Sequence, residues 1–211
     1  MFGEPLLYFF YGRPAYRTHD VKGAVSLNCS SLTCFVVQPD SLPKPKRIFP
    51  FDSGAMSRGF YEKHIHRRMK PSHFEIAADL SEAMKLVGHF YGSNTAYFMG
   101  AARAGIRFPV LDMEAQCFHS LISEKGASAT DDRRGSVEVS YDCEVPLNRD
   151  TVLAVILPAD FWDDPEISRI VKGELGAEPL SYDTFHAAPT EDTRAIMTVA
   201  KDFLTKEGYL A

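Results

Sequence analysis

Two charged side chains, Arg13 and Glu138, belong to or directly follow segments that the sequence pattern predicts to be strands. Arg13 follows the apolar run Leu6–Phe10, so its guanidinium could reach a pocket at the end of that strand. The rigid fork of a guanidinium suits a pyrophosphate or a carboxylate. Glu138 lies on the polar side of an alternating segment, and Asp52 opens a Ser-Gly turn. We therefore take Arg13, Asp52 and Glu138 as the first candidate site.

Arg133 and Arg134, just upstream of Glu138, belong to the same set. Each member also has a purely structural interpretation. A glutamate on the polar face of an amphipathic strand is in most cases simply solvated. An arginine that follows a strand often does no more than pair with a surface carboxylate. The sequence leaves both interpretations open.

Other groups of reactive side chains are weaker candidates. His64 and His66 would project to one side of a strand, but no third metal ligand follows from the spacing, and we expect no metal. Cys117 and His119 would point apart on a helix, which favours a structural cysteine. Ser53 lacks the flanking glycine of a nucleophile elbow. A cysteine or serine hydrolase is therefore a minor alternative.

The composition is that of an ordinary globular protein. The chain has 211 residues, of which 45% are hydrophobic and 24% are charged, with 23 basic and 28 acidic side chains and a net charge of −5. This charge argues against a protein that coats nucleic acid. The four cysteines form no CxxC pair, and no apolar run is long enough for a signal peptide or a membrane span. We expect a soluble cytoplasmic protein without a membrane partner.

The charge is unevenly distributed. The basic segment Lys44–Lys70 holds eight lysine and arginine side chains against two acidic ones, a net charge of +6, which leaves −11 for the rest of the chain. The segment is either a solvated face or a docking surface for a polyanion or a phosphorylated ligand.

The elements that would position these residues follow from hydrophobic periodicity. Apolar or alternating runs predict strands over Leu6–Phe10, Leu32–Gln38, Ser136–Val145 and Thr151–Leu157, with a short or edge strand over Arg47–Phe51 because of Pro50. Helical spacing predicts helices over Ser81–Tyr91, Met113–Lys125, Pro165–Leu175 and Thr190–Glu207. The state of Tyr97–Ile106 stays open.

These segments lack the regular strand-helix-strand rhythm of a parallel α/β fold. We expect an α+β fold, with a mixed or antiparallel sheet core and flanking helices, as a single domain over residues 1–211. The core sheet is expected within residues 6–158 and the C-terminal helices within residues 163–208.

Four blocks of the sequence, in their order along the chain, resemble segments of the DarT-like DNA ADP-ribosyltransferase toxins. The blocks are Tyr8–Tyr16, Cys34–Val37, Ile48–Ala55 and Arg133–Val139. The first resembles the motif PFYF-x-x-R-x-P-M-x-Y, the third V-F-T-D-x-N-A and the fourth R-R-x-A-E-x-L-V. The match is partial, because the family's upstream element, a histidine and a helix before the first strand, has no counterpart in this sequence.

The resemblance implies an ADP-ribosyltransferase-like fold and a transfer of ADP-ribose from NAD to an acceptor, with release of nicotinamide. Arg13 would correspond to the catalytic, NAD-binding arginine and Glu138 to the catalytic glutamate. Tyr11, Tyr16 and Asp52 would complete the NAD site. Contacts to a nucleic acid or another acceptor would come from Arg47, Arg58, Arg67, Arg68, Arg133 and Arg134.

Two functions therefore stand beside each other. The first is an ADP-ribosyltransferase-like enzyme that uses NAD as substrate and modifies a nucleic acid or a protein, as a toxin or a phage-defence component. Single-stranded nucleic acid and an antitoxin-like protein would be its partners. The second is a non-catalytic module that binds a polyanionic partner through the basic segment.

Overall fold

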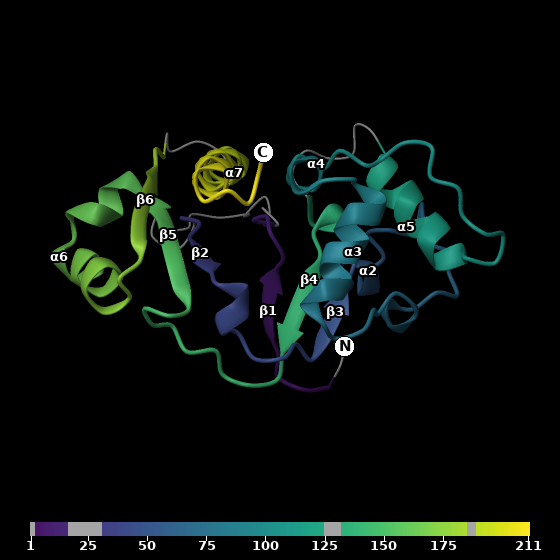
Figure 1. Ribbon diagram of the computed structural model, residues 1–211, viewed down its shortest axis with the longest axis horizontal. Coiled ribbons are helices and arrows are strands. Elements are labelled where there is room, and N and C mark those ends of the chain that lie inside the picture. The colour runs from purple at the N-terminus through teal and green to yellow at the C-terminus, as the bar shows by residue number, and fades with distance from the viewer. Residues whose placement is uncertain (1–2, 17–30, 125–131, 185–188) are drawn as a thin grey trace. The chain divides into compact units, whose positions relative to one another are not determined.

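The computed structural model describes residues 3–16, 31–124, 132–184 and 189–211 (Figure 1). The chain divides into two compact units. Unit 1 comprises Met1–Arg17, Lys44–Glu144 and Tyr209–Ala211, and unit 2 comprises Thr18–Pro43 and Val145–Gly208. The α+β class is confirmed. The expected single core sheet is wrong, because the described strands form two three-stranded sheets.

The sheet of unit 1 is antiparallel and has the strand order β1-β4-β3. Its strands are β1 (Leu7–Phe10), β3 (Arg47–Phe49) and β4 (Glu138–Tyr141). The central strand β4 pairs Glu138 with Phe10 on one side and with Phe49 on the other. Directly opposed residues of an antiparallel pair point to the same face, so Glu138 lies between these two side chains.

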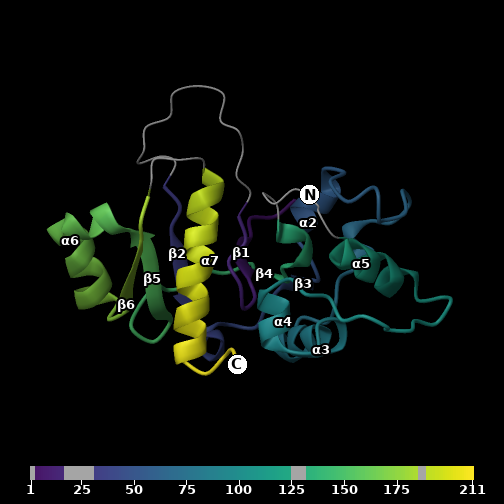
Figure 2. The ribbon, with the colours of Figure 1, turned by 90° about the horizontal axis from the view of Figure 1, so that it is seen from above.

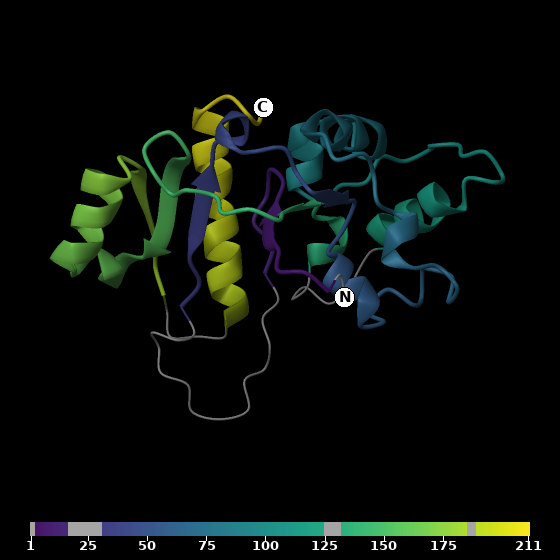
Figure 3. The same ribbon diagram turned by 90° about the horizontal axis from the view of Figure 1, so that it is seen from below.

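The helices of unit 1 gather beside this sheet (Figure 3). They are α2 (Ser53–Ser57), α3 (Leu80–Phe90), α4 (Asn94–Phe98) and α5 (Met113–Ser123), with 3₁₀ turns η2 (Pro71–His73) and η3 (Asp132–Gly135). At the start of each of these α-helices, the side chain of the capping residue accepts a hydrogen bond from a main-chain N–H of the first turn. The capping residues are Asp52, Asp79, Ser93 and Asp112. These N-caps explain where the helices begin.

Aromatic side chains fill much of the core of unit 1. Phe51 packs against Tyr61, Phe74 and Phe118, with ring centroids 5.1 to 6.1 Å apart. Phe90 of α3 meets Phe118 of α5 edge to face at 4.8 Å. The segment after β3 is therefore held on the helices by burial of large rings.

The sheet of unit 2 has the order β2-β5-β6. Its strands are β2 (Cys34–Val37), β5 (Val152–Pro158) and β6 (Glu178–Tyr182), and the turn η1 (Pro39–Ser41) follows β2. β2 is antiparallel to β5, and β6 is parallel to it.

The helical elements of unit 2 are the 3₁₀ helix η4 (Ala159–Asp163), α6 (Pro165–Ser168), the π-helix η5 (Arg169–Glu174) and α7 (Pro189–Lys206). Figure 2 shows α6 on one side of the sheet and α7 on the other. Val155, Val171 and Leu175 lie in one hydrophobic cluster with Trp162 at its margin.

Most predicted elements are confirmed with shifted ends, and the predicted helix Pro165–Leu175 consists of α6 followed by the π-helix η5. The strand β6 was not predicted, and it contains Pro179, which an edge strand tolerates. Every residue of β4 is buried, including the polar Glu138 and Ser140, whereas Asp142 and Glu144 after the strand are exposed. Of the helices in the described residues, none is long and apolar enough to cross a membrane.

Candidate active site

Glu138 is the buried carboxyl group at the centre of the candidate site. Its residue is 3% exposed, so the interpretation as a solvated side chain is wrong. Ser53 binds both of its oxygens. The hydroxyl group of Ser53 donates to Oε1 at 2.6 Å, and the main-chain N–H of Ser53 donates to Oε2 at 3.1 Å. Two donors from one residue fix the plane of the carboxyl group.

Asp52 holds this arrangement in place from the neighbouring position. It caps α2 by accepting a hydrogen bond from the N–H of Ala55 at 2.6 Å. Its other oxygen, Oδ2, accepts from Arg133 Nη1 at 2.8 Å, and its main-chain N–H donates to the main-chain oxygen of Arg133 at 3.1 Å. The structure thus brings together Asp52, Glu138 and Arg133, three of the predicted site residues.

Burial raises the pKa of Glu138 to about 7, and the nearby negative charge of Asp52 acts in the same direction. The hydrogen bonds from Ser53 and the charge of Arg133 oppose this rise without cancelling it. A carboxyl group with such a pKa can hold or release a proton near neutral pH, which is the property of a general acid or base.

Glu138→Gln is expected to remove a pH-dependent loss of stability. The pKa of Glu138 lies above its ordinary value of 4.5, so the folded state binds the proton more tightly than the unfolded state does. The resulting stability is complete below about pH 4.5 and is lost as the pH rises through about 7, a total of about 3 kcal/mol. The glutamine cannot titrate. Relative to the parent, its free energy of unfolding should therefore rise by about 3 kcal/mol between about pH 4.5 and about pH 8.5.

Urea unfolding at several pH values measures this difference. Tyrosine signals report mainly on unit 1, since eight of the nine tyrosines lie in that unit, whereas the one tryptophan, Trp162, belongs to unit 2. The exposed Glu62→Gln is the matched control, and its curve should run parallel to that of the parent. If the free energy of unfolding of Glu138→Gln ran parallel to that of the parent at all pH values, the raised pKa of Glu138 would be contradicted.

Arg13 belongs to a neighbouring group of contacts around Tyr97. Arg13 is 6% exposed, so it is not a surface side chain, and its Nη1 donates to the main-chain oxygen of Tyr97 at 3.3 Å. The Tyr97 hydroxyl group donates to the main-chain oxygen of Tyr11 at 2.7 Å and accepts from the N–H of Val137 at 2.9 Å. Tyr97 therefore links the end of β1 to the residue before Glu138.

Tyr8 and Tyr11 lie near these groups, Tyr8 beside Glu138 and Asp52 and Tyr11 with its ring centroid 6.4 Å from that of Tyr97. Tyr8 is 49% exposed, and its register opposite Ser140 places it on the same face of the sheet as Glu138. Partial burial and the charges of Glu138 and Asp52 raise the pKa of Tyr8. Tyr11 and Tyr16, which we predicted in the NAD site, are half-buried.

The predicted arginine contacts fall into two classes. Three arginines bind carboxylates of the same unit: Arg47 binds Glu75 at 2.9 Å, Arg133 binds Asp52, and Arg134 binds Glu124. The other three, Arg58, Arg67 and Arg68, are exposed. The first three arginines thus stabilise unit 1 through ion pairs, and the other three are accessible to solvent.

Sequence reasoning missed Ser53, Tyr97 and Tyr8 as members of the site. Ser53 follows Asp52 directly, and the cap at Asp52 marks the start of a helix, so this position was open to prediction. The contact of Ser53 with Glu138 spans 85 positions and carries no local signal. Tyr97 fell in a segment whose state we left open.

The other reactive side chains have separate partners. His66 Nδ1 accepts from the N–H of Arg68, and His119 Nε2 contacts the main-chain oxygen of Arg103 at 2.9 Å. Cys117 is a half-buried free cysteine of α5. Within the ranges that the structure describes, no three histidine, cysteine, aspartate or glutamate side chains are grouped to hold a metal ion.

Comparison of the chain with protein-family models, with curated proteins and with solved structures gives no match.

Proposed function

We propose that this chain is an ADP-ribosyltransferase-like enzyme that transfers ADP-ribose from NAD to a nucleic-acid or protein acceptor. The observation that supports this best is the buried Glu138, which Ser53 holds by both oxygens beside Asp52. A toxin or phage-defence role, with an antitoxin-like partner, belongs to the same proposal and rests on the resemblance of the sequence blocks.

Glu138 would supply the central chemistry. When the bond between ribose and nicotinamide breaks, nicotinamide keeps the electron pair and positive charge develops on the ribose, as in glycoside cleavage. Ionised Glu138 would stabilise that charge and take the proton of the acceptor group that bonds to the ribose. Ser53 and the Asp52–Arg133 pair would keep the carboxylate in position.

The donor set fits a dinucleotide in chemistry, since it combines a guanidinium, two carboxyl groups, a hydroxyl group and tyrosine rings. Arg13 would bind the diphosphate, with Tyr11 and Tyr16 beside it. Arg13, Asp52 and Glu138 are each less than a tenth exposed, so NAD must displace covering side chains to reach them. Tyr8, half exposed on the face of Glu138, is where a substrate would first arrive.

Incubation of the whole chain with NAD labelled in its ADP-ribose part tests the proposal. The acceptors are single-stranded DNA, double-stranded DNA, RNA and a protein mixture, each in a separate reaction. We expect release of nicotinamide together with label on one acceptor class. Absence of nicotinamide release with every acceptor would contradict the proposal.

A second candidate function is non-catalytic binding of a polyanion through the basic segment. Part of its charge is neutralised, because Lys46 pairs with Asp142, Arg47 with Glu75 and Lys63 with Glu124. The remaining five basic side chains are exposed, and none of them forms an ion pair with another described residue. They are Lys44, Arg58, Arg67, Arg68 and Lys70. These five side chains are therefore the ones in the basic segment that can bind a polyanion without breaking an ion pair within the described part of the chain.

Reversing Arg67 and Arg68 to glutamate is expected to weaken binding of a single-stranded oligonucleotide at least about tenfold near 0.1 M salt. The slope of log K against log salt should also fall by roughly 1.4, since each lost phosphate contact contributes about 0.7. Fluorescence anisotropy at several salt concentrations measures both. The matched control reverses Arg169 and Arg194, two exposed arginines of unit 2 with the same change in net charge. Equal binding by both double variants would count against this surface.

A further inference from the structure

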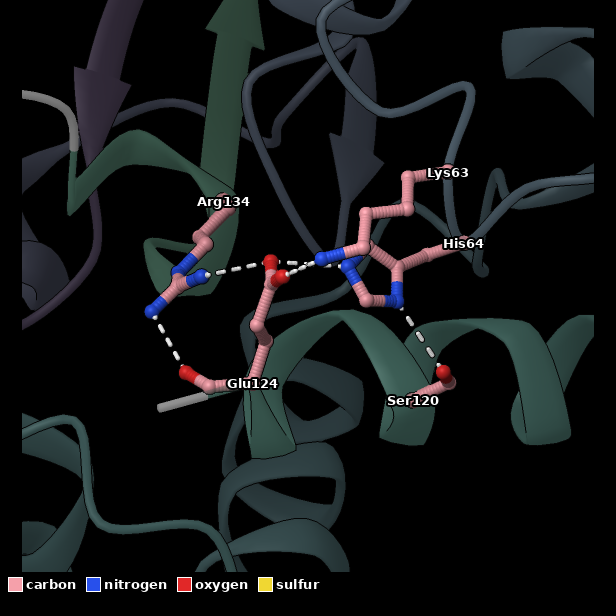
Figure 4. A network of polar contacts seen from close by, with 5 residues as sticks. All are labelled: Lys63, His64, Ser120, Glu124 and Arg134. Carbon is pink, nitrogen blue, oxygen red and sulfur yellow. Dashed lines mark hydrogen bonds and ion pairs between the residues drawn. The ribbon is translucent and has the colours of Figure 1, made fainter. Parts of the chain in front are cut away.

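A second group of reactive side chains lies outside the candidate active site, at the end of α5 (Figure 4). The imidazole ring of His64 lies between Ser120 and Glu124. Its Nδ1 is 3.0 Å from Ser120 Oγ, and its Nε2 is 2.8 Å from Glu124 Oε2. A hydroxyl group, an imidazole and a carboxylate are thus joined in one line of hydrogen bonds.

The direction of these hydrogen bonds follows from the charge on Glu124. Hydrogen bonds from Lys63 and His64 lower the pKa of Glu124 to about 2, so its carboxylate is ionised and can only accept. Nε2 of His64 must therefore carry a proton toward Glu124. In the neutral imidazole Nδ1 is then unprotonated and accepts the hydrogen of Ser120. The serine hydroxyl group faces a base.

Side chains from α5, from the segment with Lys63 and His64, and from η3 hold this arrangement. Ser120 and Glu124 are four positions apart at the end of α5, so their side chains share one face of the helix. Besides His64, Glu124 binds Lys63, and its main-chain oxygen accepts from Arg134 Nη2 at 2.9 Å. The side chain of His64 is only 12% exposed, whereas Ser120 is an exposed residue that a reagent can reach.

We propose that Ser120 is a nucleophile, activated by His64, that takes acyl or phosphonyl groups from activated donors. Ser120 Oγ bonds to the carbonyl carbon or the phosphorus atom of the donor, and its proton moves to Nδ1 of His64. The bond to the leaving group breaks, and that group leaves with the electron pair and receives the proton from His64 or from solvent. Glu124 orients the imidazole and stabilises the positive charge it carries during the transfer.

The position of Ser120 in the helix limits the kind of donor. Main-chain N–H groups inside a helix are used by the helix itself, so the backbone around Ser120 has no spare donor for a developing oxyanion. The base alone is worth about 10²- to 10⁴-fold in rate. We therefore expect reaction with fluorophosphonates and aryl esters, and none with unactivated amides.

Labelling of the folded chain with a fluorophosphonate, followed by peptide mass mapping, tests the proposal and does not depend on NAD chemistry. We expect Ser120 to be labelled at least about tenfold faster than Ser123, an exposed serine on the same helix. This comparison needs no variant. Equal labelling of the two serines would overturn the proposal.

Replacing the base tests the role of His64. His64→Gln is expected to slow labelling of Ser120 about 100-fold. His119→Gln is the matched control, because His119 lies 3.5 Å from Ser123 on α5, and it should change labelling of Ser120 less than about twofold. A His64→Gln variant that keeps the parent's circular dichroism and labels as fast as the parent would overturn the proposal. If that variant does not fold, the ratio of the labelling rates of Ser120 and Ser123 in the parent tests the proposal.

Discussion

Glutamine in place of Glu138 is expected to lower the rate of nicotinamide release from NAD at least about 100-fold. A positioned acid or base contributes about 10²- to 10⁴-fold, and glutamine keeps the shape of the side chain but cannot ionise. With the amide oxygen at the place of Oε2, the N–H of Ser53 can still donate to it, and the Ser53 hydroxyl group can turn to accept from the amide NH2 group at the place of Oε1, so the site should keep its structure. The rate constant, measured with saturating NAD and a fixed acceptor, checks this.

The pH dependence of the parent enzyme adds a second test of the same residue. If ionised Glu138 works, the rate should rise about tenfold per pH unit below about pH 7 and become level above it, because burial raises the pKa of Glu138 to about 7. Glu75→Gln is the matched control, since it makes the same chemical change beside the same sheet at the partner of Arg47. More than a tenth of the parent rate in Glu138→Gln would show that another group does this chemistry.

Alanine in place of Tyr97 is expected to destabilise unit 1 by about 5 kcal/mol. Removing a buried aromatic ring costs about 3 to 5 kcal/mol, and the loss of the hydroxyl group leaves one buried and one partly buried main-chain group without their partner. Those groups are the N–H of Val137 and the main-chain oxygen of Tyr11. Since folded domains are stable by only about 5 to 15 kcal/mol, much of unit 1 would unfold.

Hydrogen exchange of the β1 and β4 amides measures this loss directly in unit 1. Tyr97→Phe keeps the ring and should cost about 2 kcal/mol, the part that belongs to the two hydrogen bonds. Tyr8→Phe is the control, because it removes the hydroxyl group of a half-exposed residue and should change stability by less than about 0.5 kcal/mol. Equal stability of Tyr97→Phe and the parent would contradict the link between β1 and β4 through Tyr97.

Elements whose signal is local can be predicted from the sequence alone. The apolar runs of β1, β2 and β5 and the helical spacing of α3, α5 and α7 are visible within a few residues, because burial of one face imposes its period on the chain. The prediction of an edge strand from Pro50 is confirmed, since β3 lies at an edge of its sheet. The strand β6 was missed because its pairing with β5, more than twenty positions upstream, sets its state, and its own residues include a proline.

The character of the candidate site depends on contacts that form only in the folded chain. The alternation around Glu138 is the same for a solvated and a buried glutamate, and what separates them is that β4 is the central strand with both faces covered. Ser53 lies far from Glu138 in sequence, and only the fold brings its hydroxyl group to the carboxylate. Likewise, Arg47, Arg133 and Arg134 look like free positive charges until packing places a carboxylate against each of them. A charge is attracted or neutralised by neighbours in space, and those neighbours are set by long-range packing that no local pattern encodes.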